Sequence, residues 1–156
     1  MLTTVKLLEF EEGYRSQVYY CSEGYPTIGI GKKIGSHKQP LSDFALIDVP
    51  KSVAYAWLEY DLQTTIKQCQ TFKWFNALNQ ARKDIIVSMC YQLGFDGFCK
   101  FKKAIKHIEN RDFSLAAQEM LDSRWARQTP ERAHRHSKVM AVGDWDAVEQ
   151  YKHIGD

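Results

Sequence analysis

The sequence lacks any long hydrophobic run. No stretch approaches the roughly 18 apolar residues that a membrane-spanning helix needs. The first ten residues also lack the charged and apolar pattern of a secretory signal peptide, so we expect synthesis in the cytoplasm without stable membrane insertion. Low-complexity tracts and internal repeats are missing too, which argues against disordered and repeat architectures.

A large excess of charge of either sign is also missing. The 21 Lys and Arg residues nearly balance the 19 Asp and Glu residues, for a net charge of +2. This balance argues against a nucleic-acid binder, and no nucleic-acid-binding motif is present. Basic residues still gather in two clusters, which are either solvated helix faces or surfaces that attract anionic polymers. They are Lys100, Lys102, Lys103 and Lys106, and then Arg124, Arg127, Arg132, Arg135 and Lys138.

Metal-ligand spacings are missing among the four cysteines, Cys21, Cys69, Cys90 and Cys99. In a cytoplasmic protein we expect free thiols, with Cys69 and Cys90 buried on helices. The histidines do not complete a convincing ligand set either, so we predict neither a metal nor another cofactor.

The hydrophobic period changes along the chain. Apolar residues at helical spacing predict a helix over 2–12, which Gly13 ends. Residues 15–35 are β-prone and carry turn chemistry at 22–26, which predicts an antiparallel hairpin or three-stranded sheet. Residues 36–50 show no clear period and read as a loop.

From residue 51 the helical period returns. A long helix is predicted over 51–69, and further helices over 78–93, 101–109, 113–121, 131–138 and 144–152. This order indicates an α+β fold, in which a long helix joins a small antiparallel β lobe to a larger helical lobe. We expect a single domain over 1–156, with a β-rich lobe at 13–60 and a helical lobe from 1–12 and 61–156.

One acidic residue stands where the first helix ends and the hairpin begins. Eight residues separate this Glu12 from Cys21, and five more separate Cys21 from Thr27. On a hairpin, positions 21 and 27 can face each other across the strands, close to Glu12. On residue type alone, Glu12 also fits a solvated helix-end glutamate, and Thr27 an ordinary strand threonine.

Residues 12–31, EGYRSQVYYCSEGYPTIGIG, resemble the active-site segment of phage lysozymes of the T-even type, glycoside hydrolase family 24. That segment carries Glu, eight residues, Asp or sometimes Cys, five residues, then Thr. Three more blocks resemble the family in family order, at 89–94, 123–133 and 143–146. The resemblance implies a lysozyme-like fold and hydrolysis of the β-1,4 bond between N-acetylmuramic acid and N-acetylglucosamine in peptidoglycan.

The same resemblance assigns the catalytic roles. Glu12 would donate a proton to the leaving sugar oxygen, and Thr27 would orient the attacking water for an inverting reaction. Cys21 stands where the family usually has an aspartate. Three roles stay open for this thiol: a thiolate that stabilises positive charge on the sugar, a covalent nucleophile, or a neutral spacer.

Five further residues are implied on the substrate side: Tyr91, Gln92, Trp125, Gln128 and Arg132. Tyr91 would stack on a sugar face, and Gln92 and Gln128 would supply hydrogen bonds around the site. Trp125 would contact substrate or, on the alternative that we favour, pack in the core. Arg132 would lie near Glu12 and hold its side chain.

These expectations describe a monomeric phage endolysin whose partner is peptidoglycan. Lacking a signal peptide, it would stay in the host cytoplasm until a holin-type pore released it to the periplasm. The first alternative is a lysozyme-like module that binds peptidoglycan but has weakened turnover because the aspartate is missing. The second is a nucleic-acid binder that uses the basic C-terminal third.

Overall fold

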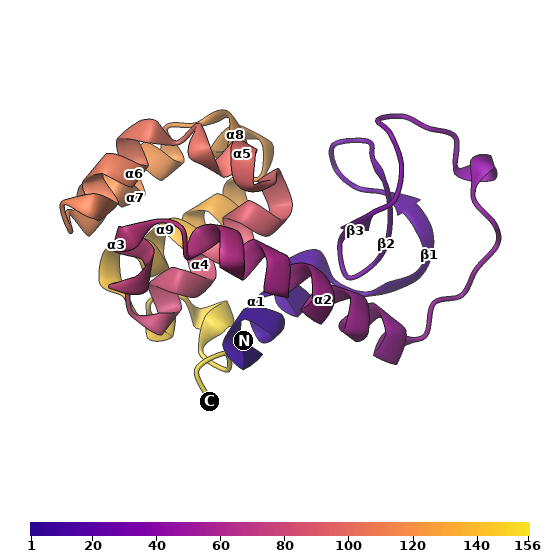
Figure 1. Ribbon diagram of the computed structural model, residues 1–156, viewed down its shortest axis with the longest axis horizontal. Helices are drawn as coiled ribbons and strands as arrows, with labels where there is room; N and C mark the ends of the chain where they lie inside the picture. Colours follow the sequence, from indigo (N-terminus) through magenta and orange to yellow (C-terminus); the bar gives the residue numbers. More distant parts are fainter. The chain divides into compact units, whose positions relative to one another are not determined.

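The computed structural model describes residues 1–156 and divides into two compact units (Figure 1). The helical unit comprises Met1–Leu7 and Thr65–Asp156, and the sheet unit comprises Leu8–Thr64. The sheet unit thus begins five residues earlier and ends four residues later than the β-rich lobe expected at 13–60. Helices α1 (Leu2–Glu12) and α2 (Lys51–Cys69) contribute residues to both units. The chain is mostly helical with one three-stranded antiparallel sheet, so the expected α+β class is confirmed.

The sheet unit is built around three short antiparallel strands in the order β1-β2-β3. They are β1 (Arg15–Tyr20), β2 (Pro26–Gly29) and β3 (Lys32–Lys33). The central strand β2 is buried along its whole length. It approaches α2 closely, because a Cβ atom added at Gly29 would lie 3.2 Å from the Cβ atom of Ala54. The predicted sheet is confirmed, and α2 supplies the apolar face that covers it.

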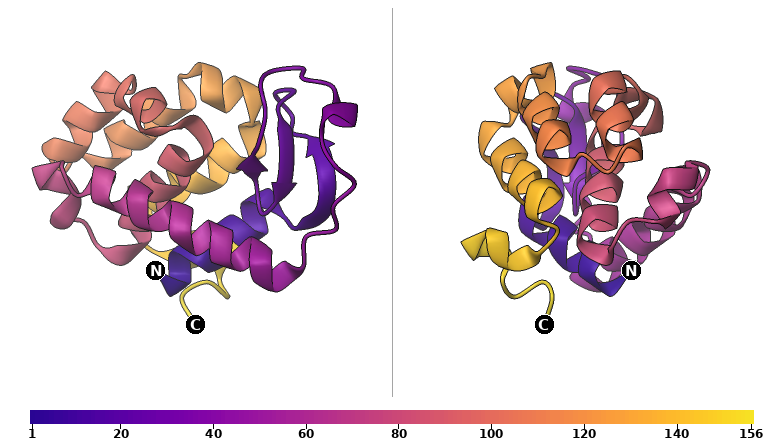
Figure 2. Two further views of the ribbon diagram at one scale, coloured as in Figure 1. Left: turned by 45° about the vertical axis from the view of Figure 1, so that its right-hand side comes forward. Right: turned by 90° about the vertical axis from the view of Figure 1, so that its left-hand side faces the viewer.

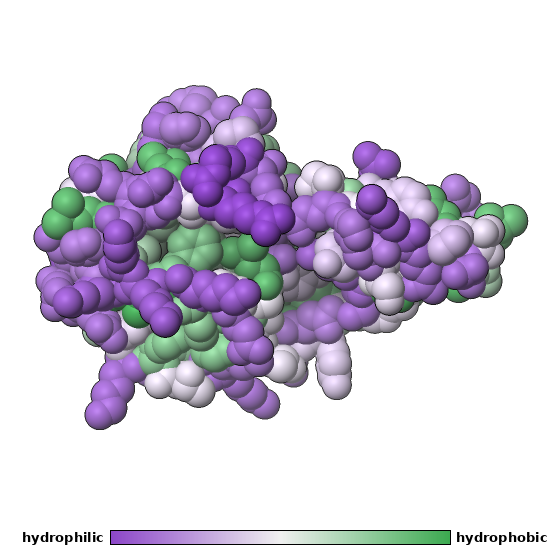
Figure 3. All heavy atoms as spheres, turned by 90° about the horizontal axis from the view of Figure 1, so that it is seen from above, coloured by the Kyte–Doolittle hydropathy of each residue, from purple (hydrophilic) through white to green (hydrophobic).

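A long connection between β3 and α2 runs alongside the strands and contains the short helix η1 (Leu41–Asp43) (Figure 2). Backbone hydrogen bonds hold it at both ends: the Lys38 amide donates to the Gly24 carbonyl at 2.8 Å, and the Val49 amide to the Ser16 carbonyl at 2.8 Å. Leu46 and Ile47, in the second half of this connection, are exposed. The face drawn in Figure 3 is mostly hydrophilic, with some hydrophobic residues showing between the polar ones.

The helical unit packs its helices around α4, α7 and α9. Helix α7 contacts α6, α8 and α9, while α4 contacts α5 and α9 (Figures 1 and 2). The elements are α3 (Lys73–Asn76), α4 (Gln80–Leu93), α5 (Phe95–Cys99), α6 (Lys102–Glu109), α7 (Phe113–Leu121), α8 (Arg124–Gln128), α9 (Pro130–Val142), η2 (Trp145–Ala147) and η3 (Glu149–Tyr151).

The predicted helices α4, α6, α7 and α9 are confirmed, and three short helices, α3, α5 and α8, were not predicted. The helix predicted over 144–152 is wrong. Gly143 ends α9 in the left-handed conformation with φ of 81°, and the Asp144 side chain then accepts a hydrogen bond from the Asp146 amide. Such a side-chain turn competes with α-helix, and two 3-10 turns, η2 and η3, form instead.

Aromatic rings form a continuous chain through the core of the helical unit. Consecutive centroids lie 5.8 to 6.3 Å apart along the order Phe72, Phe98, Phe101, Trp125, His136, Tyr151 and Trp145. Rings at this spacing contribute more than their buried area alone. No helix combines the length and apolar character that crossing a membrane requires.

Candidate active site

Glu12 is the last residue of α1, and its side chain lies against the turn that joins β2 to β3. A Cβ atom added at Gly31 would lie 2.7 Å from both Cδ and Oε2 of Glu12. Gly31 also has φ of 66°, in the left-handed region that side chains disfavour. The absence of a side chain at Gly31 therefore leaves the space that the carboxyl group occupies.

Cys21 follows β1 and begins the turn to β2. Its amide donates to the Tyr25 carbonyl at 3.0 Å, and the Gly24 amide donates back to the Cys21 carbonyl at 2.9 Å. The thiol is half-buried and forms no disulfide. Position 21 does not pair directly with position 27, because the ladder places Tyr19 opposite Thr27.

Thr27 lies on β2 and is buried. Its hydroxyl donates at 2.8 Å to the carbonyl of Tyr25, which lies in the turn directly before β2, so this turn sets the orientation of the hydroxyl. A hydroxyl that donates its one hydrogen still carries two acceptor lone pairs. Thr27 can therefore accept a hydrogen bond from water without giving up its internal contact.

Tyr19 is a neighbour of both Glu12 and Cys21 that sequence reasoning missed. Burial, followed by the negative charge of Glu12, raises the pKa of the Tyr19 phenol, and Cys21 adds a smaller effect of the same sign. The Arg15 guanidinium lies 4.4 Å from the ring centroid and opposes the shift. Tyr19 precedes Cys21 by two residues, the spacing that places strand side chains on one face, and this was the available signal.

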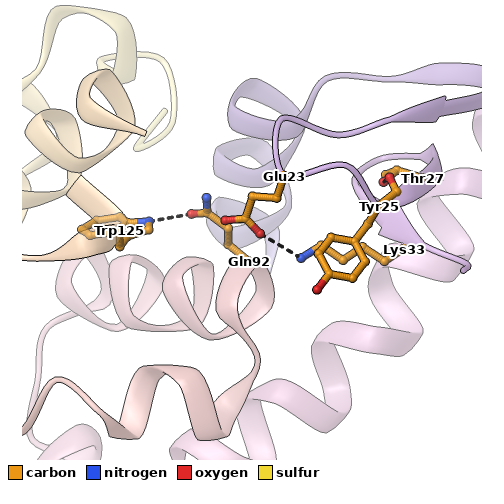
Figure 4. A network of polar contacts seen from close by, with 6 residues as sticks. All are labelled: Glu23, Tyr25, Thr27, Lys33, Gln92 and Trp125. Carbon is orange, nitrogen blue, oxygen red and sulfur yellow. Dashed lines mark hydrogen bonds and ion pairs between the residues drawn. The ribbon is translucent and has the colours of Figure 1, made fainter. Parts of the chain in front are cut away.

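The basic residues near the hairpin have partners of their own. Lys32 forms an ion pair with Asp61 at 2.7 Å. Lys33 lies 3.7 Å from a Glu23 carboxylate oxygen and 4.9 Å from the Tyr25 ring centroid (Figure 4). No group of three or more His, Cys, Asp or Glu side chains is arranged to hold a metal ion.

Gln92 and Trp125 meet inside the helical unit. The Trp125 indole Nε1–H donates to Gln92 Oε1 at 2.8 Å, so the amide nitrogen of Gln92 points away from the indole (Figure 4). Trp125 itself is 3% exposed and packs against Phe101 and His136. This burial supports the core-packing alternative for Trp125, with Gln92 held by it.

Arg132 belongs to a buried polar chain between α4, α9 and the C-terminal turns. Its Nη2 donates to Ser88 Oγ at 2.9 Å, and Ser88 Oγ is 2.8 Å from His136 Nε2. His136 Nδ1 is in turn 3.0 Å from the Tyr151 hydroxyl. Burial, then the charges of Arg132 and Arg135, holds the pKa of His136 well below its usual range. Each member of the chain thus restrains the next.

The two remaining predicted substrate residues also lie in the helical unit. Tyr91 is half-buried on α4, one residue before Gln92, and Gln128 is exposed at the last position of α8. The predicted residues thus fall into two groups: Glu12, Cys21 and Thr27 in the sheet unit, and Tyr91, Gln92, Trp125, Gln128 and Arg132 in the helical unit.

Comparisons with known proteins agree with this reading. Residues 9–138 match the family described as phage lysozyme. The chain is 30% identical to Probable T4-type lysozyme 1 of Dictyostelium discoideum, over 96% of this chain and the full length of that protein. It is also 30% identical to Pre-baseplate central spike protein Gp5 of Enterobacteria phage T4, over 94% of this chain but only 29% of that protein.

A further relative is Peptidoglycan hydrolase gp36 of Pseudomonas phage phiKMV, 26% identical over 87% of this chain and 15% of that protein. The matches confirm the expected class of enzyme, a glycoside hydrolase of the lysozyme type. With 130 consecutive positions matched, including the segment that carries Glu12, Cys21 and Thr27, the chain belongs to the phage lysozyme family.

Proposed function

We propose that this protein hydrolyses the β-1,4 bond between N-acetylmuramic acid and N-acetylglucosamine in bacterial peptidoglycan. Membership in the phage lysozyme family and the similarity to a phage protein named as a peptidoglycan hydrolase support this substrate. The observation that carries the proposal is the position of the Glu12 carboxyl group, which lies against a glycine in the same unit as Cys21 and Thr27.

In this reaction Glu12 is the proton donor. Breaking a glycosidic bond leaves an alkoxide unless an acid protonates the departing oxygen, and a positioned carboxylic acid typically contributes 10²–10⁴-fold, to order of magnitude. The contact with Gly31 supports this role, because it restrains the side chain of Glu12 from one side.

Cys21 takes the place that an aspartate usually occupies in the family. As the bond breaks, positive charge develops on the sugar ring, and a thiolate beside the ring would stabilise it. The turn formed by the Cys21 and Gly24 amides supports an active role, since it fixes the backbone that carries the thiol. Alkylation of Cys21 should then abolish hydrolysis, while Cys21→Asp should retain it. Full activity after alkylation would exclude the role.

Thr27 holds the attacking water. Its hydroxyl hydrogen is committed to the Tyr25 carbonyl, which leaves the oxygen as an acceptor for one hydrogen of a water molecule. A water held by this fixed acceptor would attack the sugar from a constant direction, as an inverting mechanism requires.

In the helical unit, Tyr91, Gln92, Gln128 and Arg132 are proposed as the residues on the substrate side. Gln92 is the best supported, since the Trp125 indole sets the direction of its amide group. Arg132 is supported by its restraint through Ser88. Trp125 serves as the support behind Gln92.

The experiment is hydrolysis of purified peptidoglycan and clearing of outer-membrane-permeabilised Gram-negative cells. Glu12→Gln should reduce the release of new reducing ends by at least about 100-fold, because the amide cannot donate the proton. Glu11→Gln, which changes the neighbouring carboxyl group of the same helix, is the matched control and should stay active. Equal activity of Glu12→Gln and the natural protein would refute the proposal.

The cysteine in place of aspartate favours one second candidate, a module that binds peptidoglycan with weakened turnover. This candidate predicts sedimentation with purified peptidoglycan but no release of reducing ends by the natural protein. If the natural protein binds without hydrolysis and Cys21→Asp hydrolyses peptidoglycan, the result would establish this binding module.

A further inference from the structure

Two buried thiols touch in the helical unit. The Sγ atoms of Cys69 and Cys90 lie 3.6 Å apart, although the residues are 21 positions apart in the chain. Cys69 is the last residue of α2, Cys90 lies in α4, and both side chains are buried. None of the catalytic roles proposed above uses either thiol.

We propose that Cys69 and Cys90 are a modification site, at which an oxidising thiol–disulfide partner forms an intramolecular disulfide. A disulfide bond is about 2.05 Å long, so each of the two sulfur atoms has to move toward the other by about 0.8 Å. Cys69 can provide this movement. It ends its helix, and the chain turns directly after it, where the Phe72 amide donates to the Cys69 carbonyl at 3.1 Å.

The oxidant is a small disulfide such as oxidised glutathione, or the active-site disulfide of a dithiol oxidoreductase. One cysteine loses its proton and attacks the oxidant, which expels a first thiolate and leaves a mixed disulfide. The second cysteine then loses its proton and attacks the mixed disulfide, expelling a second thiolate. The protein gives up two electrons and two protons, and the oxidant ends as two thiols.

The environment of the pair sets how the reaction proceeds. Contact with Cys69, followed by burial, raises the pKa of the Cys90 thiol. Because a thiol must ionise to react, oxidation proceeds through local opening at the end of α2 rather than in the closed core. Cys99 is the natural competitor. It is half-buried at the end of α5, and burial, followed by the charges of Asp96 and Cys69, raises the pKa of its thiol.

Once formed, the bond would stabilise the helical unit. It closes a loop of about 20 residues, and a cross-link of that size reduces the freedom of the unfolded chain. The expected shift of the thermal midpoint is roughly 6–12 °C upward for a chain of this length. Reduction with a dithiol should reverse the shift.

The test incubates the full-length reduced protein with oxidised glutathione and then blocks the remaining thiols. The expected product has lost two hydrogen atoms, keeps two blocked thiols, and melts at a higher temperature. Peptide mapping needs one precaution: trypsin leaves Cys90 and Cys99 together on residues 84–100. A second cleavage before Asp96 separates them.

The variants Cys69→Ala and Cys90→Ala should lose both the cross-link and the shift, while the matched control Cys99→Ala should keep them. If either core variant folds poorly, the peptide map of the natural protein decides alone. Four blockable thiols after oxidation, or a cross-link that joins any other cysteines, overturns the proposal. These readouts require no hydrolysis, so they stand or fall independently of the proposed function.

Discussion

At the scale of single residues, a missing side chain at Gly31 defines the space for the proposed acid. In Gly31→Ala the new methyl group would lie 2.7 Å from the Glu12 carboxyl, which has to move away. A displacement of about 1 Å at a catalytic group can cost on the order of 100-fold. We expect a loss of hydrolysis of about 10- to 100-fold with the folded structure retained, measured as release of reducing ends.

Gly94→Ala is the matched control for this change. Gly94 has φ of 77°, in the same left-handed region as Gly31, but an added Cβ atom would meet nothing within 4 Å. Both variants carry backbone strain, and only Gly31→Ala places a methyl group against the carboxyl of Glu12. Equal losses in the two variants would show that strain, and not the position of Glu12, explains the effect.

His136 makes stability depend on pH. Its pKa is held well below 6.5 in the folded protein, mainly by burial. Below about pH 6.5 the His136 imidazole is therefore protonated in the unfolded chain but stays neutral in the folded chain, so the free energy of unfolding falls as pH falls. We expect this residue to contribute up to about 1.4 kcal/mol per pH unit to that loss. His136→Gln should flatten the dependence in chemical denaturation, whereas His134→Gln, on the exposed face of α9, should not.

Sequence reasoning at this scale could identify residue types but not their partners. The spacing of Glu12, Cys21 and Thr27 is visible in the chain, yet the bond from Thr27 to the Tyr25 carbonyl depends on the turn geometry. The sequence shows Lys32 as a cation of the hairpin, but not that it pairs with Asp61 on α2, 29 positions later. Such pairings need the fold, because side-chain chemistry alone allows several.

At the scale of elements, Arg82 of α4 ties together the ends of two other helices. It donates from Nε to the Met140 carbonyl at 2.8 Å and from Nη2 to the Ala141 carbonyl at 3.1 Å. Its guanidinium also lies 3.6 Å from the centroid of the Phe113 ring, at the start of α7. The last carbonyls of α9 thus receive donors from outside the helix.

Arg82→Ala should destabilise the protein by about 2–4 kcal/mol, because it removes two charged hydrogen bonds and a ring contact. Arg82→Lys should recover only part of this loss, since an ammonium group lacks the planar fork. Arg127→Ala, an exposed arginine on α8, serves as control. Urea denaturation measures the free energies of unfolding, and full recovery in Arg82→Lys would mean that charge alone matters.

The long, periodic helices could be predicted from sequence, and the short ones could not. The pattern over 113–121 coincides with α7, because its buried residues Ala116, Ala117 and Met120 follow helical spacing. The short helices α3, α5 and α8 have four or five residues, too few to show a period. The failure at 144–152 has another cause, the side-chain turn at Asp144.

At the scale of the whole molecule, the helical unit is discontinuous in sequence. Residues Met1–Leu7 belong to it together with Thr65–Asp156. Within the unit, Thr4 Oγ1 donates to the buried Asp84 at 2.7 Å, and Leu7 is completely buried. The first seven residues therefore supply a hydrogen bond to a buried carboxyl group and fill part of the core.

A fragment of residues 65–156 should consequently fold poorly, since it leaves the Asp84 carboxylate without Thr4 and opens a cavity at Leu7. Attaching residues 1–7 after Asp156 through a short glycine linker should restore the fold, because both termini lie at the same end of this unit (Figures 1 and 2). Circular dichroism and thermal melting compare the two. A fragment as stable as its extended form would contradict the expectation.

This discontinuity also bears on the order of events during synthesis. Residues 1–7 leave the ribosome before residues 65–156, which complete the same unit. Until then the side chain of Leu7 has no core to pack into, so it stays exposed and can form non-native contacts or bind chaperones. The helical unit therefore cannot fold as its segments are synthesised, because residues 1–7 gain their packing partners only after residues 65–156 have been translated.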